Sequence, residues 1–232
     1  GDPLPDRVVL WTRVTPSREA LPGSGLGEGV ELEWQIDTSE DFGNPQTGTV
    51  TTSADSDHTV HVDPDGLEPA TEYFYRFIVK SGEFEGATSP VGRALTAPEA
   101  DASVDNLNLA IASCANWESG FFAAYGDMAQ RARGGEIDHV VFLGDYIYEY
   151  PTGEYAGKSG VARMHHPEWE ITTLEDYRQR HGRYRTDLNL QAAHAACPWI
   201  VIWDDHETAN NSWFEGAENH TDGRVEGEWP ER

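Results

Sequence analysis

The chain has 232 residues, of which 38% are hydrophobic and 11% aromatic, so it can bury a core and is not expected to be disordered. Its 41 acidic residues against 16 basic ones give a net charge of −25, which argues against nucleic acid as a partner. No apolar run approaches the roughly 20 residues that a membrane-spanning helix needs, so we expect no transmembrane segment.

The first part of the chain has the pattern of an all-β domain. Residues 30–37 alternate apolar and polar side chains, as a half-buried strand does. Further short strands are predicted at 8–14, 59–62, 73–80 and 91–96. Segments rich in glycine and proline, which indicate turns, lie at 22–29, 43–48 and 64–69. Many short strands separated by turns predict a β-sandwich over residues 1–97.

One stretch of this sandwich is more specific. Residues 66–75, Gly-Leu-Glu-Pro-Ala-Thr-Glu-Tyr-Phe-Tyr, resemble the corner motif of fibronectin type III domains. In that motif a tyrosine hydroxyl reaches back to the chain and holds the corner. We therefore expect a fibronectin III-like sandwich. The polar residues 98–106 that follow it have the composition of a linker.

The pattern changes after residue 106. Apolar runs predict buried strands at 107–113, 139–143 and 198–203, and helical spacing or composition predicts helices at 121–133, 174–184 and 188–196. Strands that alternate with helices indicate an α/β layer fold. The segment 152–173 is expected to be a loop over the site, in which His165 and His166 belong either to a substrate lid or to a plain surface loop.

Polar side chains follow each predicted strand of this layer. Ser113 and Cys114 follow the first strand, residues 144–149 the second and residues 204–207 the third. Sites in open α/β sheets lie beyond the carboxyl ends of the strands, so a thiol, carboxylates, a phenol and an imidazole are expected to converge there. Each alone has an ordinary structural explanation, but two adjacent buried carboxylates would repel each other unless a cation lies between them. Together they predict a metal site.

The same residues carry a family resemblance. Gly144-Asp145-x-x-Tyr148-Glu149 resembles the second block of calcineurin-like metallophosphatases, and Asp205-His206-Glu207 resembles their Asn-His-Glu block. Ser113-Cys114-Ala115 stands where those enzymes have Asp-x-His. With Trp203-Asp204 before the last block, the pattern is similar to PhoD-type alkaline phosphatases, a family that also contains a phospholipase D. Residues 1–3 and 9–13 resemble the start of the family's fibronectin-like N-terminal domain.

The resemblance implies a fold for the second part. Residues 107–232 would form the N-terminal half of a calcineurin-like metallophosphatase domain, an α-β-β-α sandwich that is incomplete in this chain. Only three strands are predicted, and no Gly-His-x-His-like block follows Glu207. A second polypeptide carrying the C-terminal half of the catalytic domain is therefore the expected partner.

The resemblance also implies Fe³⁺ with Ca²⁺ beside it. The ligands carried over from the family are Cys114, Asp145, Tyr148, Asp205 and Asn210. Cys114 and Tyr148 would bind the iron, and Asp145 would bridge the two metals. Asp205 would take the second-metal position, and Asn210 is a weaker candidate for calcium. Thiolate and phenolate suit ferric iron, whereas carboxylate and amide oxygens suit calcium.

The implied function is a secreted, metal-dependent phosphoesterase that acts on phosphomonoesters, phosphodiesters or phospholipids by attack of a metal-bound hydroxide on phosphorus. His206 would lie near the leaving group as an acid or an electrostatic stabiliser. Two alternatives stay open: a zinc hydrolase, and a non-catalytic secreted binding protein with a degenerate phosphatase domain. The chain begins at Gly1 rather than Met, which a removed export signal would explain.

Two further groups of residues have more ordinary expectations. Arg178, Arg180, Arg183 and Arg185 could reach a phosphate, but on a helix they are expected to pair with surface acids. Cys197 precedes Pro198 and is expected to be a buried thiol rather than half of a disulfide with Cys114.

Overall fold

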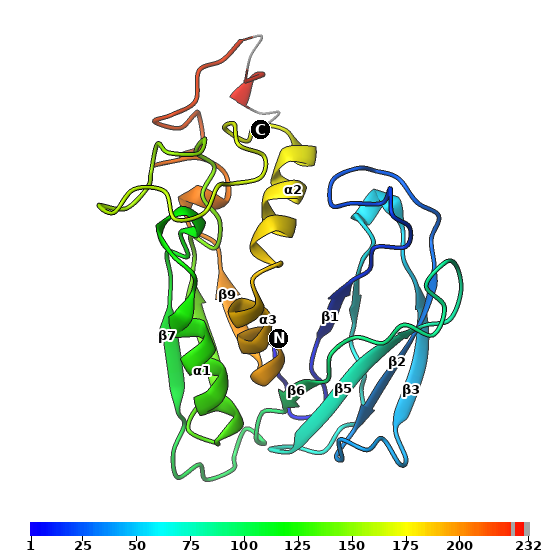
Figure 1. Cartoon of the computed structure of the whole chain (residues 1–232). Coiled ribbons are helices and arrows are strands. Elements are labelled where there is room, and N and C mark those ends of the chain that lie inside the picture. Colours follow the sequence, from blue (N-terminus) through cyan, green and yellow to red (C-terminus); the bar gives the residue numbers. More distant parts are fainter. Residues whose placement is uncertain (224–225, 230–232) are drawn as a thin grey trace.

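The first part of the chain is a β-sandwich of two antiparallel sheets, seen on the right in Figure 1. The computed structural model describes residues 1–223 and 226–229. One sheet pairs β1 with β4, and the other has the order β3-β2-β5-β6. The strands are β1 (Leu10–Arg13), β2 (Glu31–Asp37), β3 (Gln46–Thr51), β4 (Thr59–Val62), β5 (Glu72–Val79) and β6 (Gly92–Leu95).

Both sheets contribute to one apolar core. Leu32 and Ile36 of β2 are buried together with Phe77 of β5, and they pack with Leu10 of β1 and Val60 of β4 from the other sheet. These positions follow the alternation of apolar and polar residues along each strand. The predicted sandwich is therefore confirmed.

Strand β3 was not predicted, and the turn expected over residues 43–48 was partly wrong. Its sequence, Gln-Thr-Gly-Thr-Val-Thr, has little apolar content because β3 is a largely exposed edge strand. A Cβ atom at Gly48 would lie 2.4 Å from the Trp34 ring on β2, so this glycine lets the indole pack across the strand. A glycine that normally indicates a turn here permits close packing within a sheet.

The predicted corner is present in the sandwich. The Tyr73 hydroxyl accepts a hydrogen bond of 2.8 Å from the backbone N–H of Glu68. Thr96 closes the same corner, because its hydroxyl donates to the Glu68 carbonyl at 2.6 Å and accepts from the Thr71 N–H at 2.9 Å. The corner thus ties the start of β5 to the end of β6.

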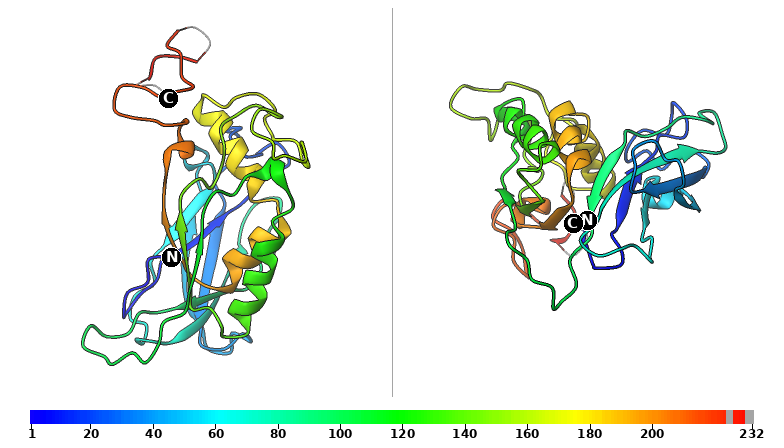
Figure 2. Two further views of the ribbon diagram at one scale, coloured as in Figure 1. Left: turned by 90° about the vertical axis from the view of Figure 1, so that its left-hand side faces the viewer. Right: turned by 90° about the horizontal axis from the view of Figure 1, so that it is seen from below.

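The second part is a three-stranded parallel sheet in the order β7-β8-β9, with its helices on one face (Figure 2). Its strands are β7 (Leu109–Ala112), β8 (His139–Leu143) and β9 (Trp199–Ile202), and its helices are α1 (Ala123–Arg133), α2 (Leu174–Tyr184) and α3 (Leu188–Ala196). Short 3-10 helices occur in this part at η2 (Trp117–Ser119) and η3 (Asp205–Glu207), and in the sandwich at η1 (Ala54–Ser56). The α/β layer is confirmed.

Local capping explains where the helices begin. The Thr173 side chain and the Asp176 side chain form a reciprocal capping box at the start of α2, and Asp187 accepts two backbone hydrogen bonds at the start of α3. Helix α1 begins at Ala123, two residues later than predicted. Phe122 has a left-handed backbone (φ +49°), so the helix cannot extend back through it.

The strands are less buried than expected. Ile111 of β7 is 68% exposed and Ile202 of β9 is 61% exposed, whereas Ala110 and Ala112 of β7 pack on the core under the helices. The prediction of fully buried strands was wrong for β7 and β9, because the helices cover only one face of the sheet. Leu109, Ile111, Leu143, Ile200 and Ile202 form an exposed apolar set, which we call the open face.

Helices α2 and α3 lie on the side of the layer that faces the sandwich (Figure 1). Arg178 of α2 donates to the Asp55 carbonyl at 2.6 Å, and the Arg185 guanidinium lies 4.6 Å from the centre of the Trp11 ring. Arg183 instead lies over Trp117. Among the described residues none of the four arginines from 178 to 185 pairs with an acid, so that expectation was wrong; they contact backbone carbonyls and aromatic rings.

The expectation for the cysteines is confirmed. Cys197 is a buried free thiol, and burial raises its pKa to about 11, while Cys114 is exposed and also free. In the part of the chain that the structure describes, no helix has the length and apolar character of a membrane span.

Candidate metal centre

The loops after β7 and β8 are joined along their backbones. The Cys114 N–H donates to the Gly144 carbonyl at 3.1 Å, and the Ala115 N–H donates to the Asp145 carbonyl at 2.8 Å. Cys114 and Asp145 both have left-handed backbones, with φ of +58° and +55°. Such strain in residues other than glycine is characteristic of functional sites, and here it places the two side chains next to each other.

Gly144 allows the β8 loop to approach the turn after β9. It has φ of +90°, and a Cβ atom there would lie 2.5 Å from both the backbone nitrogen and the Cβ of Asp204. No larger residue fits at this distance. The glycine therefore brings Asp145 close to the carboxylates that follow β9.

Glu207 fixes that approach from the other side. Its Oε2 accepts hydrogen bonds from the backbone N–H groups of Asp145 at 3.0 Å and Asp204 at 2.6 Å, and its Oε1 accepts from the Tyr146 N–H. One carboxylate thus joins two strand ends that are about sixty residues apart in sequence. Sequence reasoning used Glu207 only as part of a motif and missed this role.

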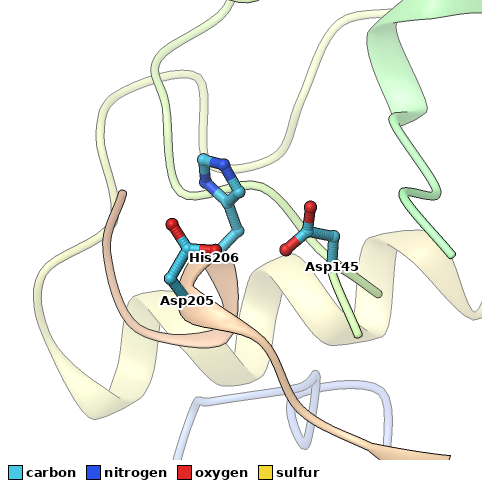
Figure 3. Close-up of side chains that lie close together, drawn as sticks. All are labelled: Asp145, Asp205 and His206. Atoms are coloured by element: carbon cyan, nitrogen blue, oxygen red, sulfur yellow. The ribbon is translucent and has the colours of Figure 1, made fainter. Parts of the chain in front are cut away.

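Asp145, Asp205 and His206 come together at these strand ends. Each offers a ligand atom, and the three atoms lie within 4.8 Å of one another. Figure 3 shows Asp205 and His206 on the turn after β9, facing Asp145 from the loop after β8. Asp145 and His206 are buried and Asp205 is half-buried. We call these three residues the acidic cluster.

Cys114 and Tyr148 join the cluster through Asp145. The Cys114 thiol and the Tyr148 hydroxyl both donate to Asp145 Oδ2, at 3.5 Å and 3.1 Å. Burial, and then the charge of Asp145, raises the pKa of Tyr148 well above its ordinary value. The other Asp145 oxygen, Oδ1, is buried without a hydrogen-bond partner among the described residues. A buried carboxylate oxygen without a partner is costly, and a bound cation would satisfy it.

Asn210 stands apart from these residues. Its side-chain amide donates to Glu218 at 3.2 Å, and its backbone N–H donates to Glu149 at 2.6 Å. The side chain is therefore held by another acid rather than by Asp145 or Asp205. A role for Asn210 in binding a metal stays a prediction.

Glu149 is a second residue whose role sequence reasoning missed. It is fully buried, and its Oε2 lies 2.7 Å from His206 Nδ1. Its Oε1 accepts from the backbone N–H of Asn210 and, at 2.8 Å, from the Asn219 amide. Burial alone would lower the pKa of His206, but the hydrogen bond to Glu149 and the nearby carboxylates outweigh it and raise that pKa. The position of Glu149 directly after Tyr148 in the motif was the sequence signal that could have pointed to this role.

Aromatic rings surround the imidazole. The centre of the His206 ring lies 4.5 Å from that of Tyr148, 5.5 Å from Tyr150 and 6.0 Å from Tyr155. Tyr155 belongs to the long segment between β8 and α2, which forms neither helix nor strand, as predicted. His165 in this segment is 2% exposed, so it is part of the core and not of a plain surface loop.

A groove of about 1000 Å³ begins beside Cys114. Its lining includes Ile111, Phe122 and Met128 and the segment from Glu154 to Lys158. The groove is mostly apolar, and its charged lining residues are Glu154 and Lys158. Its lining is connected to the acidic cluster through Cys114, whose thiol donates to Asp145.

Comparisons with known proteins agree with this geometry. A family model described as PhoD-like phosphatase matches residues 109–232, and one described as PhoD-like phosphatase, N-terminal domain, matches residues 1–98. The chain is 46% identical over 213 residues to alkaline phosphatase D of Bacillus subtilis (strain 168), a match that covers 91% of this chain and 34% of that relative. A solved structure described as "Structure of PhoD" superposes with a TM-score of 0.86 at 43% identity, covering 96% of this chain and 41% of that one.

Proposed function

Because the chain belongs to the PhoD-like phosphatase family, we propose that it forms the first part of a metal-dependent phosphoesterase. It spans about a third of the length of the curated relative that it matches (34%), so the activity of a whole enzyme is part of the proposal. The observation that carries it is the acidic cluster, whose buried Asp145 has one oxygen without a partner in the described residues.

The donor set fits two kinds of cation. A thiol, a phenol and a carboxylate at Cys114, Tyr148 and Asp145 suit ferric iron, and the carboxylates of Asp145 and Asp205 suit calcium. Asn210 is included as a weaker calcium candidate. Bound metals would supply Lewis-acid stabilisation of charge on the phosphate and would lower the pKa of a water molecule.

His206 is the residue that we assign as the proton donor. Glu149 holds its Nδ1, so Nε2 is the nitrogen available to a leaving group. Burial lowers the pKa of the ring, but the hydrogen bond to Glu149 and the nearby carboxylates outweigh burial and raise it. We therefore assign His206 the transfer of a proton to the leaving alcohol, and Glu149 the orientation of the ring.

The substrate class is a phosphate ester with an organic leaving group. The groove beside Cys114 is apolar where Phe122 and Met128 line it, which favours a substrate larger than a bare phosphate. Phosphomonoesters, phosphodiesters and phospholipids all have this chemistry.

We also propose that a further polypeptide segment completes the domain. The open face exposes Leu109, Ile111, Leu143, Ile200 and Ile202 side by side on one sheet. Continuous apolar surfaces of this kind normally mark an interface. Most of the length of the relative lies outside the match, which supports a covering segment that corresponds to that remainder.

Metal content of the purified complete enzyme tests the proposal. We expect iron and calcium by elemental analysis, and we expect Asp145→Ala to lose metal and activity together. Asp127→Asn, an exposed carboxylate on α1, is the matched control and should keep both. Zinc alone would favour the zinc hydrolase, and an active enzyme without any metal would contradict the assignment. Full activity of this chain without a further segment would contradict the completing partner.

A further inference from the structure

Arg180 lies at the centre of α2 and is completely buried, with 0% of its surface exposed. Its guanidinium donates hydrogen bonds to four backbone carbonyls. One nitrogen, Nη1, bonds Tyr148 and, at 3.2 Å, Tyr150; the other, Nη2, bonds Pro167 at 2.8 Å and Trp169 at 3.0 Å. The four carbonyls come from the two ends of the long segment between β8 and α2.

This placement of a charge is costly. Burial lowers the pKa of Arg180 to about 10, although Glu118, Glu149 and Asp176 oppose the shift by their charges. No carboxylate among the described residues lies within ion-pair distance of the guanidinium, and its Nε has no hydrogen-bond partner there. Arginine is suited to such a position because its planar fork serves several carbonyls at fixed angles, which a lysine ammonium cannot do.

The carbonyls that Arg180 holds belong to the segment that carries two site side chains. The Tyr148 hydroxyl donates to Asp145, and Glu149, the next residue, bonds His206. A shift of the backbone at Tyr148 or Tyr150 would therefore move both the phenol and the carboxylate that orients the imidazole. On the other side, Pro167 and Trp169 end the loop that contributes Tyr155 to the site.

We propose that Arg180 is a positioning residue of the metal centre. It clamps residues 148–150 to residues 167–169 and so sets the place of the Tyr148 phenol beside Asp145. The inference rests on the proposed function only in taking Tyr148 as an iron ligand. The clamp between the two ends of the loop does not depend on a metal.

Arg180→Lys is the test variant, because it keeps the charge and most of the side chain but cannot bond four carbonyls. Arg178→Lys is the matched control, since Arg178 lies on the same helix and bonds the sandwich instead. Two readouts are measured on the complete enzyme. One is the phenolate-to-iron charge-transfer absorption per bound iron, and the other is tryptic cleavage after the exposed Lys158 in metal-free protein.

We expect Arg180→Lys to shift or weaken the absorption per iron and to speed cleavage after Lys158 by about tenfold, a change that corresponds to roughly 1.4 kcal/mol of opening free energy. Arg178→Lys should leave both readouts unchanged. A merely structural role would lower the melting temperature but leave the absorption per iron at its wild-type energy. Unchanged absorption and unchanged cleavage in Arg180→Lys would overturn the proposal.

The assignment of Tyr148 as an iron ligand and the Arg180 clamp can be refuted separately. If the wild-type enzyme binds iron but shows no phenolate absorption, Tyr148 is not a ligand, and the cleavage readout alone decides the clamp. If Arg180→Lys does not fold, hydrogen exchange of the unaltered protein decides instead. Residues 148–150 and 167–169 should then open together with α2, and independent, faster exchange of either segment would overturn the clamp.

Discussion

Glu149 Oε2 lies 2.7 Å from Nδ1 of His206, and both residues are buried. A carboxylate in this position sets which imidazole nitrogen carries a proton and holds the plane of the ring. The pairing also links the loop after β8 to the turn after β9. Substitution of either residue should therefore affect the same step of the reaction, and this effect can be measured separately from any loss of metal.

His206→Ala and Glu149→Gln should both slow the reaction without removing metal. We expect a loss of about 10²–10⁴ in kcat for His206→Ala, the usual size for a proton-transfer group. Glu149→Gln should cost less for a good leaving group such as a nitrophenol than for an alkyl alcohol, because only the alcohol needs the proton. Kinetics with both substrates and elemental analysis check this. Equal losses for both substrates would contradict proton transfer, and Glu168→Gln, an exposed acid, should behave as wild type.

Gly144→Ala should destabilise the fold more than Gly135→Ala. Both glycines have left-handed backbones, with φ of +90° and +76°, so each substitution costs on the order of 1 kcal/mol in backbone strain. Only Gly144 also has Asp204 at 2.5 Å from the added Cβ, whereas nothing lies within 4 Å at Gly135. Urea unfolding of the two variants measures the difference. Equal losses of unfolding free energy would show that the loops can separate without cost.

Acid should destabilise the protein through its buried histidines. Burial, assisted by nearby arginines, lowers the pKa of His165 to about 3 and that of His181 to about 4, from an ordinary value of 6.5. Below pH 6.5 these two histidines bind protons in the unfolded chain but stay neutral in the folded chain. Stability should therefore be complete above about pH 7 and fall as the pH drops toward 4, by up to about 1.4 kcal/mol per pH unit for each histidine.

A histidine variant isolates this effect. In urea unfolding at a series of pH values, His165→Gln should show a shallower loss of unfolding free energy between pH 6.5 and 4. His61→Gln removes an exposed histidine of β4 and should follow the wild-type curve. A His165→Gln curve parallel to that of the wild type would mean that the imidazole is protonated in the folded state.

Tyr73→Phe should destabilise the sandwich by about 0.5–1.5 kcal/mol, because it removes the hydroxyl that accepts from the Glu68 N–H at 2.8 Å. Tyr75→Phe is the control on the same strand, since its hydroxyl makes no hydrogen bond within the described residues. Thermal unfolding compares the two variants. An effect no larger than that of the control would show that the corner is held by packing alone.

The sequence predicted the elements with strong periodicity. Strand β8 and helices α2 and α3 lie where the apolar spacing placed them, because packing and capping agree there with local preference. Strand β3 was missed since its pattern depends on a neighbour: Gly48 faces the Trp34 ring, which no local rule reveals. The exposure of Ile111 and Ile202 was also not predictable, because an apolar run does not show which of its faces is covered.

The candidate site shows the same division. The strand-end positions of Asp145, Asp205 and His206 followed from the layer topology, and the structure brings these side chains together. The contacts that hold these side chains in place could not be predicted from the layer topology. The roles of Glu149, Glu207 and Arg180 depend on bonds between segments that lie up to about sixty residues apart, which motif spacing cannot show.

The backbone bonds between the loops after β7 and β8 limit how such chains can change length during evolution. Cys114 and Asp145 occupy matching positions in two adjoining loops, and each loop supplies the hydrogen-bond partner of the other. A residue inserted or deleted in either loop would slide one side chain past its neighbour and separate them. The segment from Gly157 to Val161 bears no such constraint, because it is exposed and lies between clamped ends. Relatives should therefore differ in length over that segment and keep the two strand-end loops at constant length.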